Sequence, residues 1–335
     1  MFKYIVKRLG ISIIILLGVS IIIYTMVRLM PIDFITTNFA GQISTGAFDE
    51  NDLIRFKELY GLADNSFLGI LKGYFQWLGN VLKGDLGNSF KYRKPVTQVI
   101  GENMWISFAI AMIATILQFL IAIPLGISSA THQYSVRDYT VTIFTMIGLS
   151  LPTYFFAAIV VKIFAVTLGW LPANGLIYAS SSYPETFLGF LSKLGDMAVH
   201  LILPIGVSVI LSLGGLMRYT RTNTLEVLSA DYIRTARAKG LSEKKVVYKH
   251  AFRNTLIPLA TLLAGIIPSL FGGMMITEQV FAIDGIGRLA YQALTVGDIP
   301  FVMGYNMFLA ILTVLGTLLS DIMYSIVDPR VKLGK

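Results

Sequence analysis

The amino-acid sequence predicts an all-α polytopic membrane protein with six transmembrane helices. Its 335 residues are 55% hydrophobic and only 14% charged, and the mean hydropathy is +0.71, whereas soluble domains carry about 25% charged residues. Six stretches are apolar over the roughly 20 residues that a helix needs to cross a bilayer. This composition excludes a disordered chain and argues against a water-soluble enzyme. We expect the spans at Leu9–Met30, Met104–Ala130, Tyr139–Leu168, Ala198–Tyr219, Leu256–Phe281 and Phe301–Val327.

The positions of Lys and Arg orient these spans. With the amino terminus inside, the cytoplasmic pieces hold 3, 1, 9 and 3 Lys/Arg, in the order 1–8, 131–138, 218–255 and 328–335. The two shorter outside loops, near 169–197 and 282–300, hold one each. Cytoplasmic loops of membrane proteins carry the excess of positive charge. We therefore expect residues 1–335 to form a single transmembrane domain with both termini in the cytoplasm.

The segment 31–103 falls outside the membrane in this topology and contains a predicted amphipathic helix. Apolar residues recur there every three to four positions, at Phe67, Leu71, Phe75, Leu78 and Leu82, with polar residues between them. Such a pattern is typical of a helix that lies in the membrane interface or packs against other helices. The alternative interpretation is an outer lid or a docking surface for an extracytoplasmic partner.

The predicted spans contain few ionisable residues and several prolines. Lys162, Glu278 and Asp321 lie toward span ends, where we expect interface or helix-end partners. Prolines interrupt the helices and free backbone carbonyls that neighbours or water must satisfy. Hydroxyl residues accompany these interruptions, which predicts a translocation pathway or hinge; ordinary helix packing explains them equally well. The candidate residues are Ser150, Pro152, Thr153, Ser208 and Ser212.

The predicted cytoplasmic loop 218–255 has the features of a docking element. It carries nine Lys/Arg against three Asp/Glu, a net charge of +6 within the +8 of the chain. We expect Ser229 to cap a helix that begins near Asp231 and ends at Gly240, and Ser242 to cap a second helix. A loop of this size is too small to build its own core, so we expect the first helix to expose an apolar face at Tyr232, Ile233, Ala236 and Ala238. The alternative is a basic loop resting on anionic lipid headgroups.

The sequence gives no sign of chemistry carried out by this chain. There is no cysteine, the three histidines are scattered, and neither a G-x-x-x-x-G-K-[ST] phosphate loop nor a G-x-S-x-G elbow occurs. We therefore expect no catalytic residue, no metal site and no bound cofactor. Because most of the positive charge lies in one loop and the flanks of the spans, we also expect no nucleic-acid partner.

Several motifs resemble one family. DYIRTARAKGLS at 231–242, followed by HAFRNTLIP at 250–258, resembles the coupling loop of bacterial ABC importer permeases, in particular the B-type permease of the oligopeptide/dipeptide/nickel branch. GDLGNS at 84–89, LPTYF at 151–155 and GWLPANG at 169–175 are similar to segments of that branch in the same order. The sequence departs from the superfamily pattern at Arg234-Thr235-Ala236, where Glu-Ala-Ala is usual, and from the branch at Met30-Pro31-Ile32-Asp33.

The resemblance implies a type I importer permease fold in a bacterial inner (cytoplasmic) membrane. It implies a heterodimer with a homologous second permease, two cytoplasmic ATPase subunits that use ATP and Mg²⁺, and an extracytoplasmic substrate-binding protein. The implied substrate is an oligopeptide or dipeptide; a nickel or metal-chelate importer and, less favoured, a stand-alone secondary transporter are the alternatives. The ATPase-docking residues would be Asp231, Tyr232, Ile233, Arg234, Thr235, Ala236, Ala238, Lys239, Gly240 and Leu241.

Overall fold

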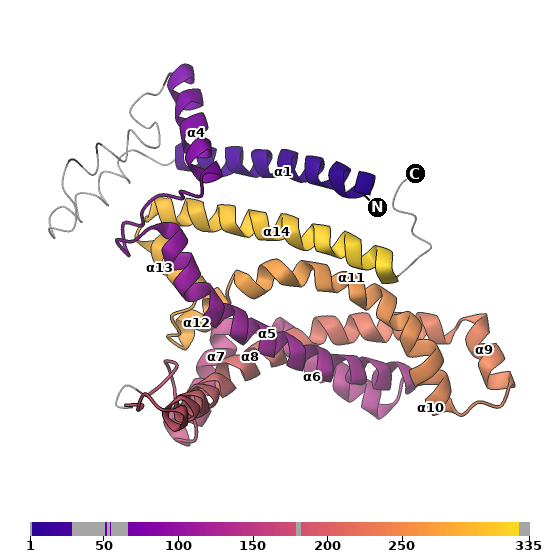
Figure 1. Ribbon diagram of the computed structural model, residues 1–335. Helices are drawn as coiled ribbons and strands as arrows, with labels where there is room; N and C mark the ends of the chain where they lie inside the picture. The colour runs from indigo at the N-terminus through magenta and orange to yellow at the C-terminus, as the bar shows by residue number, and fades with distance from the viewer. Residues whose placement is uncertain (1, 29–50, 52–53, 55–65, 179–181, 328–335) are drawn as a thin grey trace. The chain divides into compact units, whose positions relative to one another are not determined.

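The computed structural model describes residues 2–28, 51, 54, 66–178 and 182–327, and these residues form helices and connecting turns without an extended strand (Figure 1). The chain divides into two compact units. The first contains Met1–Trp105 and Leu289–Leu318, and the second contains Ile106–Arg288 and Leu319–Leu333. Three helices, α5, α13 and α14, have residues in both units.

The first unit contains helices that share a hydrophobic core. Its elements are α1 (Phe2–Arg28), α4 (Phe67–Leu82), the start of α5 (Val96–Thr131) and most of α13 (Ile286–Thr295) and α14 (Ile299–Val327). Helix α4 coincides with the predicted amphipathic segment, and Ser66 caps it by accepting the N–H of Gly69. Figure 1 shows α4 crossing α1 near the carboxyl end of α1. The buried side chains there include Tyr24, Trp77 and Met303.

A buried carboxylate, Asp298, organises the polar part of the first unit. Asp298 precedes Ile299 and Pro300 at the start of α14, and it accepts the N–H of Phe301, as an N-cap residue does. The same carboxylate accepts the Ser89 hydroxyl and the N–H groups of Phe90 and Lys91. One side chain at the end of a membrane helix therefore holds the turn at residues 89–91.

The second unit contains the remaining helices. They are α6 (Val136–Ser150), α7 (Thr153–Val160), the π-helix η1 (Val161–Thr167), α8 (Phe187–Leu228), α9 (Asp231–Ala238), α10 (Glu243–Lys245), the π-helix η2 (Val246–Ala251), α11 (Phe252–Phe271) and α12 (Met275–Val280). The 42 residues of α8 span about 63 Å at 1.5 Å per residue, about twice the thickness of a bilayer core. Glycine allows α6 to pack closely on α8, since a Cβ at Gly214 would lie 2.6 Å from the carbonyl oxygen of Thr145.

Four of the described helices are long and apolar enough to cross a membrane. They are Lys7–Met26, Val96–Thr131, Phe187–Leu228 and Ile299–Leu319, which overlap the predicted first, second, fourth and sixth spans. The predicted third span corresponds to Val136–Ser150 and Thr153–Thr167, which meet at a bend of 105°. Counted as one broken span, this pair raises the number to five. The number of six spans and the cytoplasmic side of both termini remain predictions.

Two predicted spans are interrupted. The third is not one continuous helix, because Leu151 precedes a proline and takes an extended conformation (ψ 130°). The fifth, expected over 256–281, divides into α11 and α12, because Gly273 has a φ of +75° that ends the helical path. The predicted cytoplasmic tail 328–335 and most of 31–65 lie outside the described residues.

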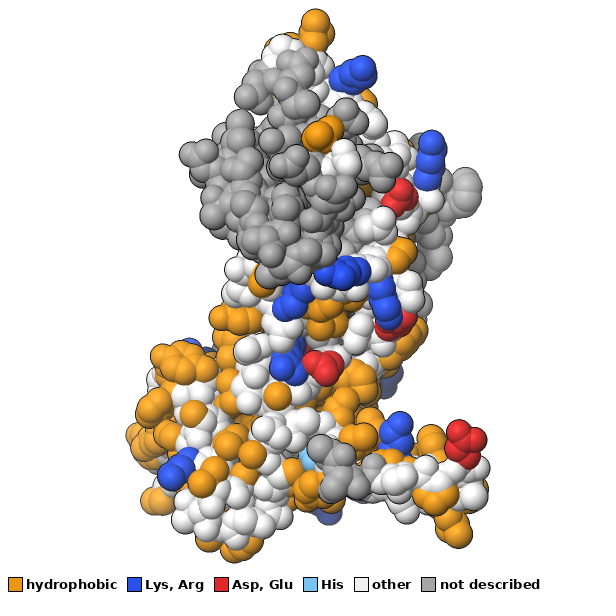
Figure 2. Space-filling model, turned by 90° about the vertical axis from the view of Figure 1, so that its left-hand side faces the viewer, with side chains coloured by type: hydrophobic (Ala, Val, Ile, Leu, Met, Phe, Trp, Pro, Cys, Tyr) orange, Lys and Arg blue, Asp and Glu red, His pale blue; other side chains and the backbone are white. Residues whose placement is uncertain are grey.

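The surface is that of a protein surrounded by an apolar medium or by partners. Large hydrophobic side chains on α1, α5, α6 and the start of α8 are exposed. On the face drawn in Figure 2, hydrophobic side chains lie openly at the surface over much of the lower part of the view. A soluble monomer rarely exposes apolar patches of more than a few hundred Å², so this surface fits a multi-pass membrane protein.

Candidate functional site

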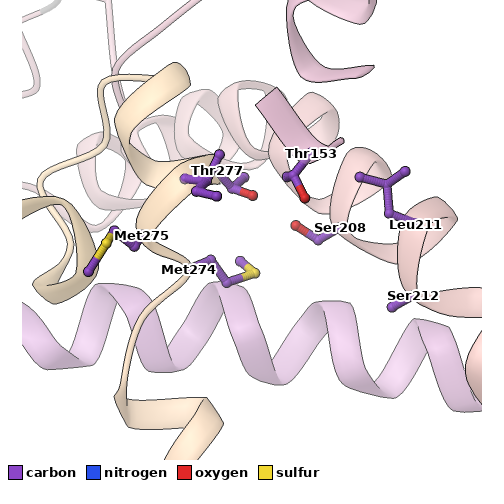
Figure 3. A pocket seen from close by; sticks show the side chains of 8 residues that line it. Thr153, Ser208, Leu211, Ser212, Met274, Met275 and Thr277 are labelled. Carbon is purple, nitrogen blue, oxygen red and sulfur yellow. The ribbon is translucent and has the colours of Figure 1, made fainter. Parts of the chain in front are cut away.

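A pocket of about 490 Å³ lies in the second unit between α7, α8 and the segment that leads into α12. Three of the five predicted pathway residues, Thr153, Ser208 and Ser212, line it together (Figure 3). None of the eight lining side chains is ionisable. The complete lining is Thr153, Ser208, Leu211, Ser212, Met274, Met275, Ile276 and Thr277.

The serine hydroxyls of α8 are oriented by their own helix. Ser208 Oγ donates to the carbonyl oxygen of Pro204 at 2.8 Å, and Ser212 Oγ donates to that of Val209 at 3.0 Å. A hydroxyl has one proton and two lone pairs, so each serine presents acceptor lone pairs toward the pocket once its proton is used within the helix. In Figure 3 the hydroxyls of Thr153 and Ser208 point toward each other from α7 and α8.

The other two predicted pathway residues stand beside the pocket and do not line it. Ser150 ends α6 and donates its hydroxyl proton to the carbonyl of Ile147 at 3.0 Å. Pro152 occupies the N-cap position of α7, directly after the 105° bend. These residues therefore shape the break that brings Thr153 to the pocket.

The pocket wall formed by Met274–Thr277 was not predicted from the sequence. The segment falls within a long apolar run that reads as the end of a membrane span. The pair Gly272-Gly273, which turns the chain just before the wall, was the available signal.

A fully buried carboxylate, Glu278, holds this wall in place. One carboxylate oxygen accepts the Ser107 hydroxyl at 2.7 Å and the N–H of Met274 at 2.9 Å; the other accepts the N–H of Arg288 at 2.9 Å. Met274 is the N-cap of α12, and Arg288 lies in the first turn of α13. A single negative charge thus stabilises two helix amino termini, where the backbone dipoles favour it.

Glycine makes room for this carboxylate. A Cβ on Gly285 would lie 2.5 Å from the Glu278 carboxylate and from Ser107 Oγ, closer than real atoms approach. Gly287 is under a similar restriction, because its Cβ would lie 2.8 Å from the backbone nitrogen of Met275. The segment EQVFAIDGIGR at 278–288 therefore forms a compact turn around the buried carboxylate of Glu278, and its glycines leave room for that carboxylate.

The loop at 218–255, predicted to be cytoplasmic, has the helix that the sequence predicts and the glycine that ends it. Helix α9 covers Asp231–Ala238, and Gly240 follows with a φ of +76°. Two capping predictions need correction. Ser229 does not cap α9: it ends α8, where its hydroxyl donates to the carbonyl of Glu226, and Ala230 is the N-cap of α9. Ser242 occupies the N-cap position of α10 without a side-chain capping bond.

The expectation that the whole apolar face of α9 is exposed is wrong. Ile233 is 0% exposed and Ala236 is 6% exposed. They pack against Val246 and Ala251 of η2, with Val227, Leu228 and Leu241 around them. The loop does form a small core, because the turn at Gly240 brings η2 back over α9 and the end of α8 adds further apolar side chains.

The outer face of α9 is polar and mostly exposed. Of the ten predicted docking residues, seven are exposed and Leu241 is half-buried; the exposed ones are Asp231, Tyr232, Arg234, Thr235, Ala238, Lys239 and Gly240. Two contacts fasten the helix to α10 and α11. Arg237 Nε donates to the Glu243 carboxylate of α10 at 2.8 Å across the glycine turn, and Asn254 of α11 donates to the Tyr232 hydroxyl at 3.0 Å.

An ion pair joins α6 to the stretch of α8 that leads into this loop. The guanidinium of Arg221 donates to both oxygens of the Asp138 carboxylate. These hydrogen bonds hold the pKa of the Asp138 carboxyl well below its usual range although burial opposes the shift; the Ser129 hydroxyl and the N–H of Tyr134 add to the effect. The same pair raises the pKa of Arg221. The corner between α5 and α6 is therefore fixed to α8 by a nearly buried charge pair.

Within the described part of the chain, no group of three or more His, Cys, Asp or Glu side chains is arranged to hold a metal ion. The closely placed polar groups are hydrogen-bonded carboxylates that fix turns. The site that the structure offers is thus a neutral pocket connected by α8 to the exposed polar face of α9.

Comparison with known proteins identifies a family. A family model described as "Binding-protein-dependent transport system inner membrane component" matches residues 122–333. The oligopeptide transport system permease protein AppB of Bacillus subtilis is 38% identical over 333 residues, which cover 99% of this chain and 100% of the relative. The dipeptide transport system permease protein DppB of Alkalihalophilus pseudofirmus is 32% identical over 342 residues, with 99% and 100% covered.

A solved structure shares the fold. The inward-facing MetNI methionine ABC transporter matches with a TM-score of 0.50 at 18% identity, over 69% of this chain and 97% of that chain. The helical architecture is accordingly that of a type I ABC importer permease. From its sequence and its fold, this chain belongs to the family of binding-protein-dependent transport system inner membrane components, the permease subunits of ABC importers.

Proposed function

We propose that this chain is the transmembrane permease subunit of an ATP-driven importer of peptides and forms half of its translocation pathway. The observation that carries the proposal is the similarity, over nearly the full length of both chains, to permeases of oligopeptide and dipeptide transport systems. The subunit moves its solute without chemistry on it and binds no cofactor of its own.

The neutral pocket is part of that pathway. The hydroxyls of Thr153, Ser208 and Ser212 come from two helices, α7 and α8, and face Met274–Thr277. The break at Leu151–Pro152 interrupts the hydrogen bonding of the third predicted span next to the pocket. A broken helix can change its angle with little loss of backbone hydrogen bonds, so Ser150 and Pro152 serve as the hinge beside the pocket.

The exposed face of α9 docks on a cytoplasmic ATPase subunit. Ile233 and Ala236 hold α9 to η2, and Asn254 holds Tyr232 to α11. A push on the exposed residues, such as Arg234 and Lys239, therefore moves α9 together with α8 and α11. This rigid connection transmits ATP-driven closure of the ATPases to the helices around the pocket.

The complete importer contains a homologous second permease, two ATPase subunits that bind ATP and Mg²⁺, and an extracytoplasmic binding protein, and it resides in a bacterial inner membrane. The test is to purify the chain from membranes, identify what copurifies, and reconstitute the assembly in vesicles. We expect ATP-dependent accumulation of a labelled peptide that requires the binding protein.

Two outcomes would overturn the proposal. Uptake of nickel but not of peptide would support the metal-chelate alternative, against which stands a pocket lining without His, Cys, Asp or Glu. Purification as a single chain, with uptake driven by an ion gradient, would identify a secondary transporter.

A further inference from the structure

We infer that the pocket binds an internal, uncharged stretch of peptide main chain and that Ser208 and Ser212 accept hydrogen bonds from its N–H groups. This inference rests on the proposed function, since it names the part of the peptide that the pathway recognises. It is argued from the lining of the pocket and from the direction of the two serine hydroxyls.

The direction of the hydroxyls defines the complementary ligand. Both protons are donated to carbonyls of α8, at 2.8 Å for Ser208 and 3.0 Å for Ser212. The oxygen atoms therefore meet a ligand as acceptors. Peptide N–H groups are donors and satisfy them. A carboxylate carries acceptors alone, so the carboxyl terminus of a peptide or an acidic side chain gains nothing from these two serines.

The rest of the lining argues for a neutral ligand. Leu211, Met274, Met275 and Ile276 supply apolar surface, and no lining residue carries a charge that could form an ion pair. Burying a charge without a partner is costly, whereas unbranched methionine side chains adapt to ligands of different shape. The pocket therefore favours what all peptides share, the main chain, and accepts varied apolar side chains beside it.

The spacing of the acceptors suits an extended ligand. Ser208 and Ser212 are four residues apart on α8 and so lie on one face of the helix, one turn from each other. Four residues of a helix rise about 6 Å, and alternate residues of an extended strand repeat about every 6.4–6.8 Å. An extended peptide lying along α8 can donate successive outward N–H groups to the two oxygens.

The first test compares peptides and variants in the complete reconstituted importer. Uptake of tetra-alanine is measured against tetra-alanine that is N-methylated on its central amides, which removes N–H donors. We expect the N-methyl group to lower uptake by about threefold to tenfold more in wild-type vesicles than in the S208A/S212A variant. Ser192 lies on α8 outside the pocket and is exposed, so S192A should behave as wild type. Because all permease variants receive peptide from the same binding protein, the preference of that protein for one peptide over the other affects every variant equally and cancels in this comparison.

A second test adds a charge. Ser212→Asp should raise the ratio of lysine-containing to glutamate-containing tetrapeptide uptake by about tenfold, and Ser192→Asp should leave the ratio unchanged. An equal N-methyl penalty in all variants, together with an unchanged charge ratio in S212D, would overturn the inference while leaving peptide import intact. Absence of any peptide uptake by the wild-type importer would instead contradict the proposed function.

Discussion

Arg221 and Asp138 form a two-point ion pair, with Nε 2.9 Å from one carboxylate oxygen and Nη2 2.8 Å from the other, although 83 residues separate them in the chain. Asp138 is 3% exposed. Ser129 donates to the same carboxylate and accepts from Arg221, at 3.1 Å from Nε. The pair closes the corner between α5 and α6 against the part of α8 that leads into α9.

Replacing Arg221 with alanine should destabilise the folded chain by about 3–5 kcal/mol, because it leaves a buried carboxylate without its partner. Chemical unfolding of the purified protein in detergent measures this. The matched control is Arg234→Ala, since Arg234 and Asp231 form a pair whose side chains are 74% and 97% exposed. That variant should lose less than about 1 kcal/mol. If both variants lose the same free energy of unfolding, burial of the Asp138 carboxylate does not make its ion pair more stabilising than an exposed one.

The ion pair also predicts a pH dependence of stability. Because the folded pKa of Asp138 lies below that of an unfolded aspartate, near 3.9, its contribution is fully present above about pH 4. It is lost as the pH falls from there toward the folded pKa. Asp138→Asn should therefore be less stable than wild type at pH 6, and the difference should shrink as the pH is lowered. A constant difference across the acid range, measured by thermal unfolding, would contradict this assignment.

Gly240→Val should impair coupling between ATP hydrolysis and uptake. Gly240 has a φ of +76°, and a β-branched residue is strained there, so the turn that sets α9 against η2 must open. We expect lower uptake per ATP hydrolysed in reconstituted vesicles. Gly195→Val on α8 is the control, because Gly195 has no positive φ and nothing lies within 4 Å of its Cβ position. Normal coupling in G240V would count against the docking role of α9.

Ile233→Ala should loosen α9 without touching its outer face. The substitution removes a fully buried side chain from the small core with Val246 and Ala251, and such deletions commonly cost about 2–5 kcal/mol. Hydrogen exchange of the Asp231–Ala238 amides should become faster. Thr235→Ala, on the exposed face of the same helix, should leave the exchange rates unchanged. If both variants exchange alike, the buried core does not hold the helix.

Glu278→Gln should disturb the pocket wall. The amide group replaces a charge that caps two helices, and its NH₂ end faces N–H and O–H donors at Ser107, Met274 and Arg288. We expect peptide uptake to fall at least tenfold while the ATPases still assemble on the permease. Asp284→Asn is the control in the same turn, because Asp284 is exposed and pairs with Arg288 at the surface. Wild-type uptake by E278Q would show that the capping has no part in transport.

The features that the sequence predicts well are those encoded locally. Hydropathy over 20 residues locates the long helices, the three-to-four-residue period locates α4, and Gly240 marks the end of α9, as the structure confirms. The grouping of Thr153, Ser208 and Ser212 follows from prolines and hydroxyls in neighbouring spans. The signals for the helices and for Gly240 each lie within one turn or one helix, and those for the pocket residues lie in two predicted spans that are consecutive in the chain.

The features that were missed depend on residues distant in the chain or on where a helix stops. Ile233 looked exposed because its burial requires Val246 and Ala251 to return across the Gly240 turn. Serine is a common N-cap residue, but α8 continues to Leu228, so Ser229 is the C-cap of α8. The wall at Met274–Thr277 was hidden because apolar residues continue on both sides of Gly273, and hydropathy does not register a change of backbone direction.

The anchoring of the turn at residues 89–91 by Asp298 has a consequence for biosynthesis. The hydrogen bonds span 207–209 residues, and a ribosome adds about 5–20 residues per second. The turn therefore waits about 10–40 s for its carboxylate to be made. A chain that ends before Asp298 therefore cannot form these hydrogen bonds, so this turn is completed only when about nine-tenths of the protein has been synthesised.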